Sequence, residues 1–260
     1  MSEKHNKRDS LPSSTGGSVA ALCCAVIFLT RIPLPFNRPM EGQQPLLYFP
    51  LVGLFIGILA AAVFYSSNLY WPQPVAVLLS VGVTLLCTGA LHEDGLADTA
   101  DGMGGGWSVE DKLRIMKDSS IGTYGALALI FALLLKLAAL STMQATDVIG
   151  ALIVAHVLSR WSALPLLRYC VYVGGGSAAA FADINNRKRF VIACVYTPII
   201  VLLVAPEKGL LALFIALLVT FASYRYFRSR LGGVTGDSLG ATNQIVEIAI
   251  YLTFLAVSPS

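Results

Sequence analysis

The sequence predicts an all-α fold, a polytopic integral membrane bundle with about six to eight apolar helical segments. Of the 260 residues, 56% are apolar and only 13% are charged, whereas soluble proteins average about 25% charged residues. The apolar residues gather in runs close to the roughly 20 residues that one membrane crossing needs. The chain has too little charge to cover a soluble domain, and its net charge of +3 gives no sign of nucleic-acid binding.

Seven apolar stretches follow one another, or eight if a close pair is counted as two. They are residues 18–34, 46–66, 74–91, 122–142, 148–166, the pair 190–205 and 209–224, and 240–257. The first is interrupted by Arg31, Pro33 and Pro35, so we expect it to lie in the interface or to be re-entrant. Residues 1–17 are polar and predict a disordered tail, and 18–260 is expected to form a single membrane-embedded catalytic domain.

The positions of Lys and Arg predict which loops face the cytoplasm. Basic residues occur in 4–8, 31–38, 112–117, 168–189 and 225–230. The intervening loops 67–73 and 143–147 have none. Because cytoplasmic loops carry the excess of Lys and Arg, we expect loops 92–121 and 225–240 on the cytoplasmic side of a bacterial-type inner membrane.

Acidic residues are concentrated in one segment, 92–118, which we expect to be a cytoplasmic acidic loop. It holds seven of the fifteen acidic residues of the chain. Asp94, Asp98 and Asp101 stand at positions i, i+4 and i+7, a spacing that puts three carboxylates on one face of a helix. Like charges so placed repel one another, so a cation is expected among them. Mg²⁺ is suitable, because it binds one or two carboxylates together with substrate phosphate.

Glycines and a second short helix complete this segment. Gly95 and Gly102 keep two positions beside the carboxylates free of side chains, and Gly104–Gly106 is expected to be a flexible break. Ser108 is a suitable N-cap for a helix that would end near Lys117.

The complete string is more specific than its parts. HxDGLADTADGxGGG, followed further on by IMKDSxIGTxG, resembles the signature of the cobalamin synthase family, the adenosylcobinamide-GDP ribazoletransferases. The likeness includes Arg31-Ile-Pro, Arg160, the string GDSLGATNQ and Glu247, and therefore runs over nearly the whole chain. Glu93 stands where the family commonly has Leu.

The resemblance implies a reaction, a cofactor and partners. Family members join adenosylcobinamide-GDP to the ribose hydroxyl of α-ribazole, or of α-ribazole 5′-phosphate, by attack on the phosphorus nearest the cobinamide. GMP leaves and adenosylcobalamin, or its 5′-phosphate, forms in the last assembly step of the cobalamin nucleotide loop. The reaction depends on Mg²⁺. Besides these substrates, the expected partner is the lipid bilayer, and nucleic acid is not expected to bind. The sequence leaves open whether the chain forms a homo-oligomer.

The acidic segment suits this chemistry, since displacement at phosphorus needs positioning and charge neutralisation more than covalent work by the protein. Asp94, Asp98 and Asp101 are the expected Mg²⁺ ligands. The general base is either one of these carboxylates, with Asp101 preferred, or His92.

Other charged residues are expected to bind substrate. Lys117 is a catalytic candidate that would contact a phosphate as a point charge, and Asp118 would orient Lys117 or join the metal site. Charged groups inside membrane segments usually face a polar interior. The further residues expected to bind substrate are Glu93, Lys136, Arg160, Asp237, Asn243 and Glu247.

The sequence alone leaves two other functions open. The pattern DGxxDxxDG also resembles the motif of membrane phosphotransferases that use CDP-alcohols, although the Ala-Arg that follows its first half there is missing. A transporter with an acidic gate would instead be expected to show internal repeats and matched broken spans. The sequence shows no such repeat, so a transferase is the preferred interpretation.

Overall fold

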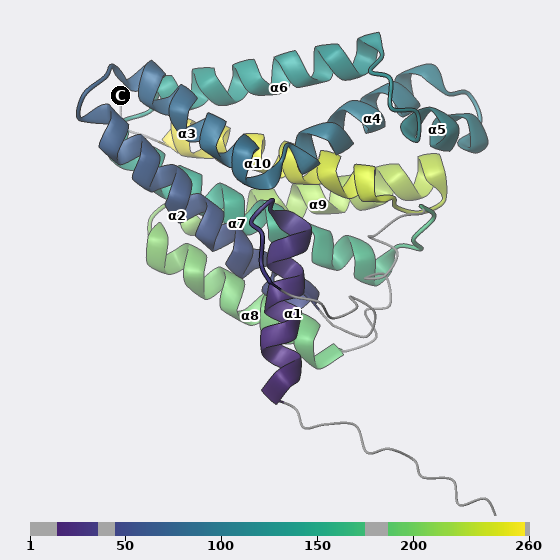
Figure 1. Cartoon of the computed structure of the whole chain (residues 1–260), viewed down its shortest axis with the longest axis horizontal. Coiled ribbons are helices and arrows are strands. Elements are labelled where there is room, and N and C mark those ends of the chain that lie inside the picture. Colours follow the sequence, from purple (N-terminus) through teal and green to yellow (C-terminus); the bar gives the residue numbers. More distant parts are fainter. Residues whose placement is uncertain (1–14, 36–44, 175–186, 258–260) are drawn as a thin grey trace, which may run out of the picture.

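The computed structural model describes residues 15–35, 45–174 and 187–257, and this part of the chain is almost entirely helical (Figure 1). The elements are α1 (Thr15–Leu29), the 3₁₀ turn η1 (Pro45–Tyr48), α2 (Phe49–Asn68), α3 (Gln73–Thr88), α4 (Leu91–Gly105), α5 (Val109–Met116), α6 (Thr123–Thr142), α7 (Ala145–Tyr169), α8 (Arg187–Val204), α9 (Gly209–Leu231) and α10 (Gly236–Val257). Extended pairing in these ranges is limited to one bridge between Tyr172 and Val234. The predicted all-α class is confirmed.

Five helical segments are long and apolar enough to cross a membrane: Pro45–Asn68, α6, α7, α9 and α10. The bent pair α3 and α4 would make a sixth if it counts as one span. The chain is therefore a multi-pass membrane protein, as its composition predicts. Helix α1 has only 15 residues, which is short for a crossing. It begins at Thr15, inside the expected tail, and residues 1–14 of that tail lie outside the described ranges.

The centre of the bundle is the contact between α2 and α7. A Cβ at Gly53 would lie 2.3 Å from the carbonyl oxygen of His156, and one at Gly57 would lie 2.7 Å from the Cα of Ile153. Small residues allow such close backbone approach between membrane helices. These glycines bring α7, with Arg160 on it, into the middle of the fold.

A sharp bend turns the acidic segment away from α3. Gly89 (φ 64°) and Ala90 (φ 55°) both adopt left-handed backbone conformations, and the axes of α3 and α4 differ by 86°. The chain after α1 lies on this bend, where the Arg31 amide donates to the Cys87 carbonyl at 2.7 Å. The acidic segment 92–118 consists mostly of two helices, α4 and α5, as the spacing of its Asp residues and the Ser108 cap predict.

Candidate active site

Helix α4 lies against the first turns of α10. A Cβ at Gly95 would be 2.9 Å from the backbone oxygen of Asp237 and 3.2 Å from the Cα of Gly240, so the two helices touch through their backbones. The start of α10 is fixed by reciprocal hydrogen bonds. The Ser238 amide donates to Thr235 Oγ1 at 3.1 Å, and the Thr235 amide donates to Ser238 Oγ at 2.8 Å. This arrangement holds Asp237 beside the acidic helix.

A cavity of about 270 Å³ lies among α1, α4, α5, α7 and α10. Its charged and strongly polar side chains are His92, Asp94, Lys117, Arg160, Asp237 and Asn243. All six are residues that the sequence singles out, although they come from segments far apart in the chain. The cavity therefore combines carboxylates with cationic groups, as a site for a metal and a diphosphate requires.

Three of these side chains present buried polar atoms without a hydrogen-bond partner in the described part of the chain. The atoms are His92 Nε2, Arg160 Nε and Asn243 Oδ1, and the residues are 7%, 2% and 3% exposed. Buried polar groups are nearly always paired in folded proteins. All three residues line the cavity.

Carboxylates crowd together at the junction of α4 and α10. Partial burial and repulsion from Asp94, Asp237 and Asp101 raise the pKa of Asp98, which lies outside the five spanning helices, to about 6. Within the described residues no three His, Cys, Asp or Glu side chains converge as a complete metal site. Mg²⁺ usually needs only one or two carboxylates, because water and substrate phosphate complete its shell. Asp94 and Asp98 suit that partial ligand set.

Asp101 has a different environment from the other two. Its Oδ2 accepts from the Gly122 amide at 2.7 Å, and its Oδ1 accepts from the Gly125 amide at 2.9 Å. The side chain thus caps the N-terminus of α6, where backbone N–H groups have no partner in the helix. Both oxygens are engaged, which favours Asp94 and Asp98 over Asp101 as metal ligands and weakens the case for Asp101 as base.

We expect Asp101→Ala to lower the free energy of unfolding by about 1–2 kcal/mol, the usual effect of losing an N-cap. Thermal unfolding of the detergent-solubilised protein measures this change. Asp118→Ala is the matched control, because Asp118 is exposed and accepts one local hydrogen bond, from the Ser120 amide at 3.0 Å. Equal stability of both variants would contradict the capping role.

Helix α5 forms as the sequence predicts and closes the cavity. The Asp111 amide donates to Ser108 Oγ at 3.0 Å, which confirms the N-cap. Met116 packs against α4, since a Cβ at Gly102 would be 2.4 Å from its Cγ. Lys117 follows directly and lines the cavity, whereas Asp118 does not. The hydrogen bond from Ser120 lowers the pKa of Asp118.

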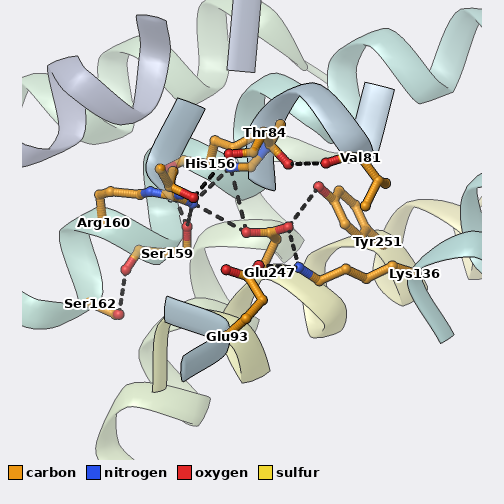
Figure 2. A network of polar contacts seen from close by, with 11 residues as sticks. Val81, Thr84, Glu93, Lys136, His156, Ser159, Arg160, Ser162, Glu247 and Tyr251 are labelled. Atoms are coloured by element: carbon orange, nitrogen blue, oxygen red, sulfur yellow. Dashed lines mark hydrogen bonds and ion pairs between the residues drawn. The ribbon is translucent and has the colours of Figure 1, made fainter. Parts of the chain in front are cut away.

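Four residues expected to bind substrate meet one another inside the bundle, around the carboxylate of Glu247 (Figure 2). Glu247 Oε1 is 2.8 Å from Lys136 Nζ, and Glu247 Oε2 is 3.2 Å from Arg160 Nη1. Lys136 Nζ is also 3.6 Å from Glu93 Oε1. The Tyr251 hydroxyl donates to Glu247 Oε1 at 3.2 Å. His156 Nδ1 lies 3.5 Å from Glu247 Oε2, and we call these six residues the Glu247 hub.

The hub is an almost fully buried, charge-balanced cluster. The side chains of Lys136, Arg160 and Glu247 are only 2–4% exposed. Two cations face the two carboxylates of Glu247 and Glu93, and isolated charges at this depth would be costly. Arg160 is the hub residue that also lines the cavity. Lys136 instead contacts both Glu93 and Glu247, which favours a structural role for these three residues.

The apolar side of the cavity could not be predicted from the sequence. Phe28 of α1, Phe49 of α2 and Tyr172 beyond α7 line it. The rings of Phe28 and Phe49 stack with centroids 5.8 Å apart. In a chain with 10% aromatic residues, no local pattern distinguishes these from other aromatic side chains.

Residues 21–255 match the profile of a family described as cobalamin-5-phosphate synthase. The chain belongs to this family. It is 43% identical to the adenosylcobinamide-GDP ribazoletransferase of Shewanella frigidimarina, over 91% of this chain and 94% of that protein. The protein of the same name from Shewanella woodyi is 41% identical, over 90% and 95%. No solved structure matches the chain significantly.

The match to the cobalamin-5-phosphate synthase family confirms the resemblance seen in the acidic string. The matched range, 21–255, also includes every residue that lines the cavity, because the lining residues run from Phe28 to Asn243. The cavity is therefore part of the family core and not of a peripheral extension.

Proposed function

We propose that the cavity between α4 and α10 is the active site at which the chain, an adenosylcobinamide-GDP ribazoletransferase, completes the assembly of cobalamin. The observation that carries this proposal is the convergence of Asp94, Asp237, Lys117 and Arg160 on one cavity. A diphosphate substrate with a metal ion needs both signs of charge within reach of the same phosphorus.

The reaction is an in-line substitution at phosphorus. The ribose hydroxyl oxygen of α-ribazole, or of its 5′-phosphate, bonds to the phosphorus nearest the cobinamide. The bond from that phosphorus to the bridging oxygen breaks, and GMP leaves with the electron pair. The hydroxyl proton passes to a base. The protein has to hold the two reactants in line and to offset the negative charge.

The residues of the cavity, together with Asp98 beside them on α4, would carry out these tasks. Asp94 and Asp98, with Asp237 opposite, would hold Mg²⁺, which when bound neutralises diphosphate charge and stabilises the leaving GMP. Lys117 and Arg160 would bind phosphate oxygens directly.

The proposed base is His92 of α4, which lines the cavity. His92 Nε2 is buried there without a partner, so an imidazole nitrogen is available to accept the ribose proton. Asn243 Oδ1, also unpaired, would accept a hydrogen bond from the neighbouring ribose hydroxyl and so orient the ribose.

The active-site end of the bundle is proposed to face the cytoplasm. Arg228 and Arg230 occupy the last turn of α9, immediately before the turn that leads to Asp237. Lys117 lies at the same cavity. Since Lys and Arg are enriched on the cytoplasmic side of an inner membrane, the charge distribution supports this orientation.

The activity is tested with purified protein in detergent, adenosylcobinamide-GDP, α-ribazole and Mg²⁺, with cobalamin and GMP measured together. We expect equal amounts of both products, no reaction in EDTA, and recovery when Mg²⁺ is restored. Protein shown to be folded that forms neither product would overturn the proposal. Release of CMP from a CDP-alcohol would then identify the phosphotransferase alternative.

A further inference from the structure

The apolar side of the cavity has no role in phosphate chemistry. We call it the apolar wall, and it consists of Phe28, Leu29, Phe49, Ala163, Tyr172 and Leu239. These side chains belong to one packed cluster that joins α1, α2, α7 and α10. The rings of Phe28 and Phe49 stack on each other in this wall, inclined by 14°. It faces the same space as the polar residues of α4 and α10.

The size of the cavity limits what can enter it. About 270 Å³ lies just under the roughly 300–1,000 Å³ of pockets that enclose a drug-sized molecule. A corrin macrocycle is far larger and has to stay outside, so the cavity can take one nucleoside with its neighbouring phosphate. The two candidates in the reaction are α-ribazole and the guanosine end of the activated substrate.

The chemistry of the wall distinguishes between these two bases. Guanine carries several hydrogen-bond donors and acceptors along its edge, and burying them without partners is unfavourable. The hydroxyl of Tyr172 is the single side-chain hydrogen-bonding group among the six wall residues. The dimethylbenzimidazole of α-ribazole has a fused aromatic ring with two methyl groups and no exocyclic donor. Such a group gains from apolar burial and ring packing.

We propose that the apolar wall is the subsite for the base of α-ribazole and that it excludes guanine, an inference that rests on the proposed function. With the base packed against the apolar wall, the ribose points to the polar side of the cavity, which His92 and Asn243 line. The corrin and the guanosine then lie outside the cavity mouth. The wall thereby orients the nucleophile toward the phosphorus.

Two wall variants test the inference in opposite ways. Phe49→Ala removes half of the stacked pair, and Ala163→Leu fills the space against which the base would pack. Each is expected to weaken binding of α-ribazole, measured by titration without turnover, by at least about tenfold. Inhibition by GMP and the KM for adenosylcobinamide-GDP should change less than about twofold. Phe55→Ala is the matched control, because Phe55 lies on the same helix but is 48% exposed, and it should alter none of these values.

A ligand series adds a readout that a merely structural defect would not change. The wild-type protein should bind α-ribazole more tightly than the analogue that lacks the two methyl groups, and Phe49→Ala should lose this preference. Equal weakening of GMP and α-ribazole binding, or unchanged binding of α-ribazole in both wall variants, would overturn the inference. If the wild-type protein forms cobalamin while the wall variants bind normally, only this inference fails. If it forms no cobalamin, the proposed function fails.

Discussion

Asp94→Asn and Asp98→Asn are each expected to lower kcat by about 10²–10³-fold, the usual effect of removing one electrostatic contact to a transition state. Asn keeps the shape of Asp but removes the negative charge that would hold Mg²⁺. Both side chains lie on α4, where the acidic cluster meets α10, and Asp94 lines the cavity itself. Initial rates of GMP release at saturating substrate, over a range of Mg²⁺ concentrations, measure the effect.

The neutral variants should also need more Mg²⁺ for half-maximal rate. Asp118→Asn is the control, since this carboxylate lies close in sequence but is exposed and does not line the cavity. It should keep nearly full activity. Wild-type rates in both Asp94→Asn and Asp98→Asn would exclude the acidic face of α4 as the metal site.

Glu247→Gln is expected to destabilise the folded protein by about 3–5 kcal/mol, as breaking a buried ion pair by removing one partner usually does. The substitution leaves Lys136 and Arg160 buried with Glu93 as the remaining carboxylate of the hub. The loss should appear as a lower midpoint of thermal unfolding in detergent. Activity should fall too, because Arg160 would no longer be held at the cavity wall.

A double-mutant cycle measures the coupling between Lys136 and Glu247 separately from the effect of each single substitution. Lys136→Met should also destabilise, whereas Lys136→Met combined with Glu247→Gln should be more stable than the sum of the single effects predicts, because neither charge is then left unpaired. Additive effects would show that Lys136 and Glu247 do not depend on each other. Glu110→Gln is the surface control, since Glu110 is exposed on α5, and it should leave the midpoint unchanged.

Local sequence pattern predicts most of the fold. Most helix ends lie within a few residues of the ends of the apolar stretches, although α9 continues to Leu231, seven residues beyond the stretch 209–224. The spacing of Asp94 and Asp98 correctly predicts a helix there. The bend before it could not be predicted, because Gly89 is a weak signal and Ala90 in a left-handed conformation gives none. The spacing thus predicts the helix itself but not the 86° bend that turns it away from α3.

Long-range pairing limited the prediction of the site. A buried charge such as Lys136 or Glu247 shows from sequence that it needs a partner, but the partner is chosen by how the helices pack. Asp101 fits the helical spacing of the cluster, yet its position beside the start of α6 makes it a cap. Phe28 and Phe49 become a wall only because α1 folds back onto α2.

The most direct test of the central claim is whether metal and diphosphate share the α4–α10 site. Mn²⁺ replaces Mg²⁺ in protein mixed with adenosylcobinamide-GDP in the absence of α-ribazole, and the two phosphorus resonances are recorded by ³¹P NMR. We expect strong paramagnetic broadening of both resonances with wild-type protein and its loss in the Asp94→Asn, Asp98→Asn double variant. Broadening that persists unchanged in the double variant would place the metal elsewhere and contradict the account.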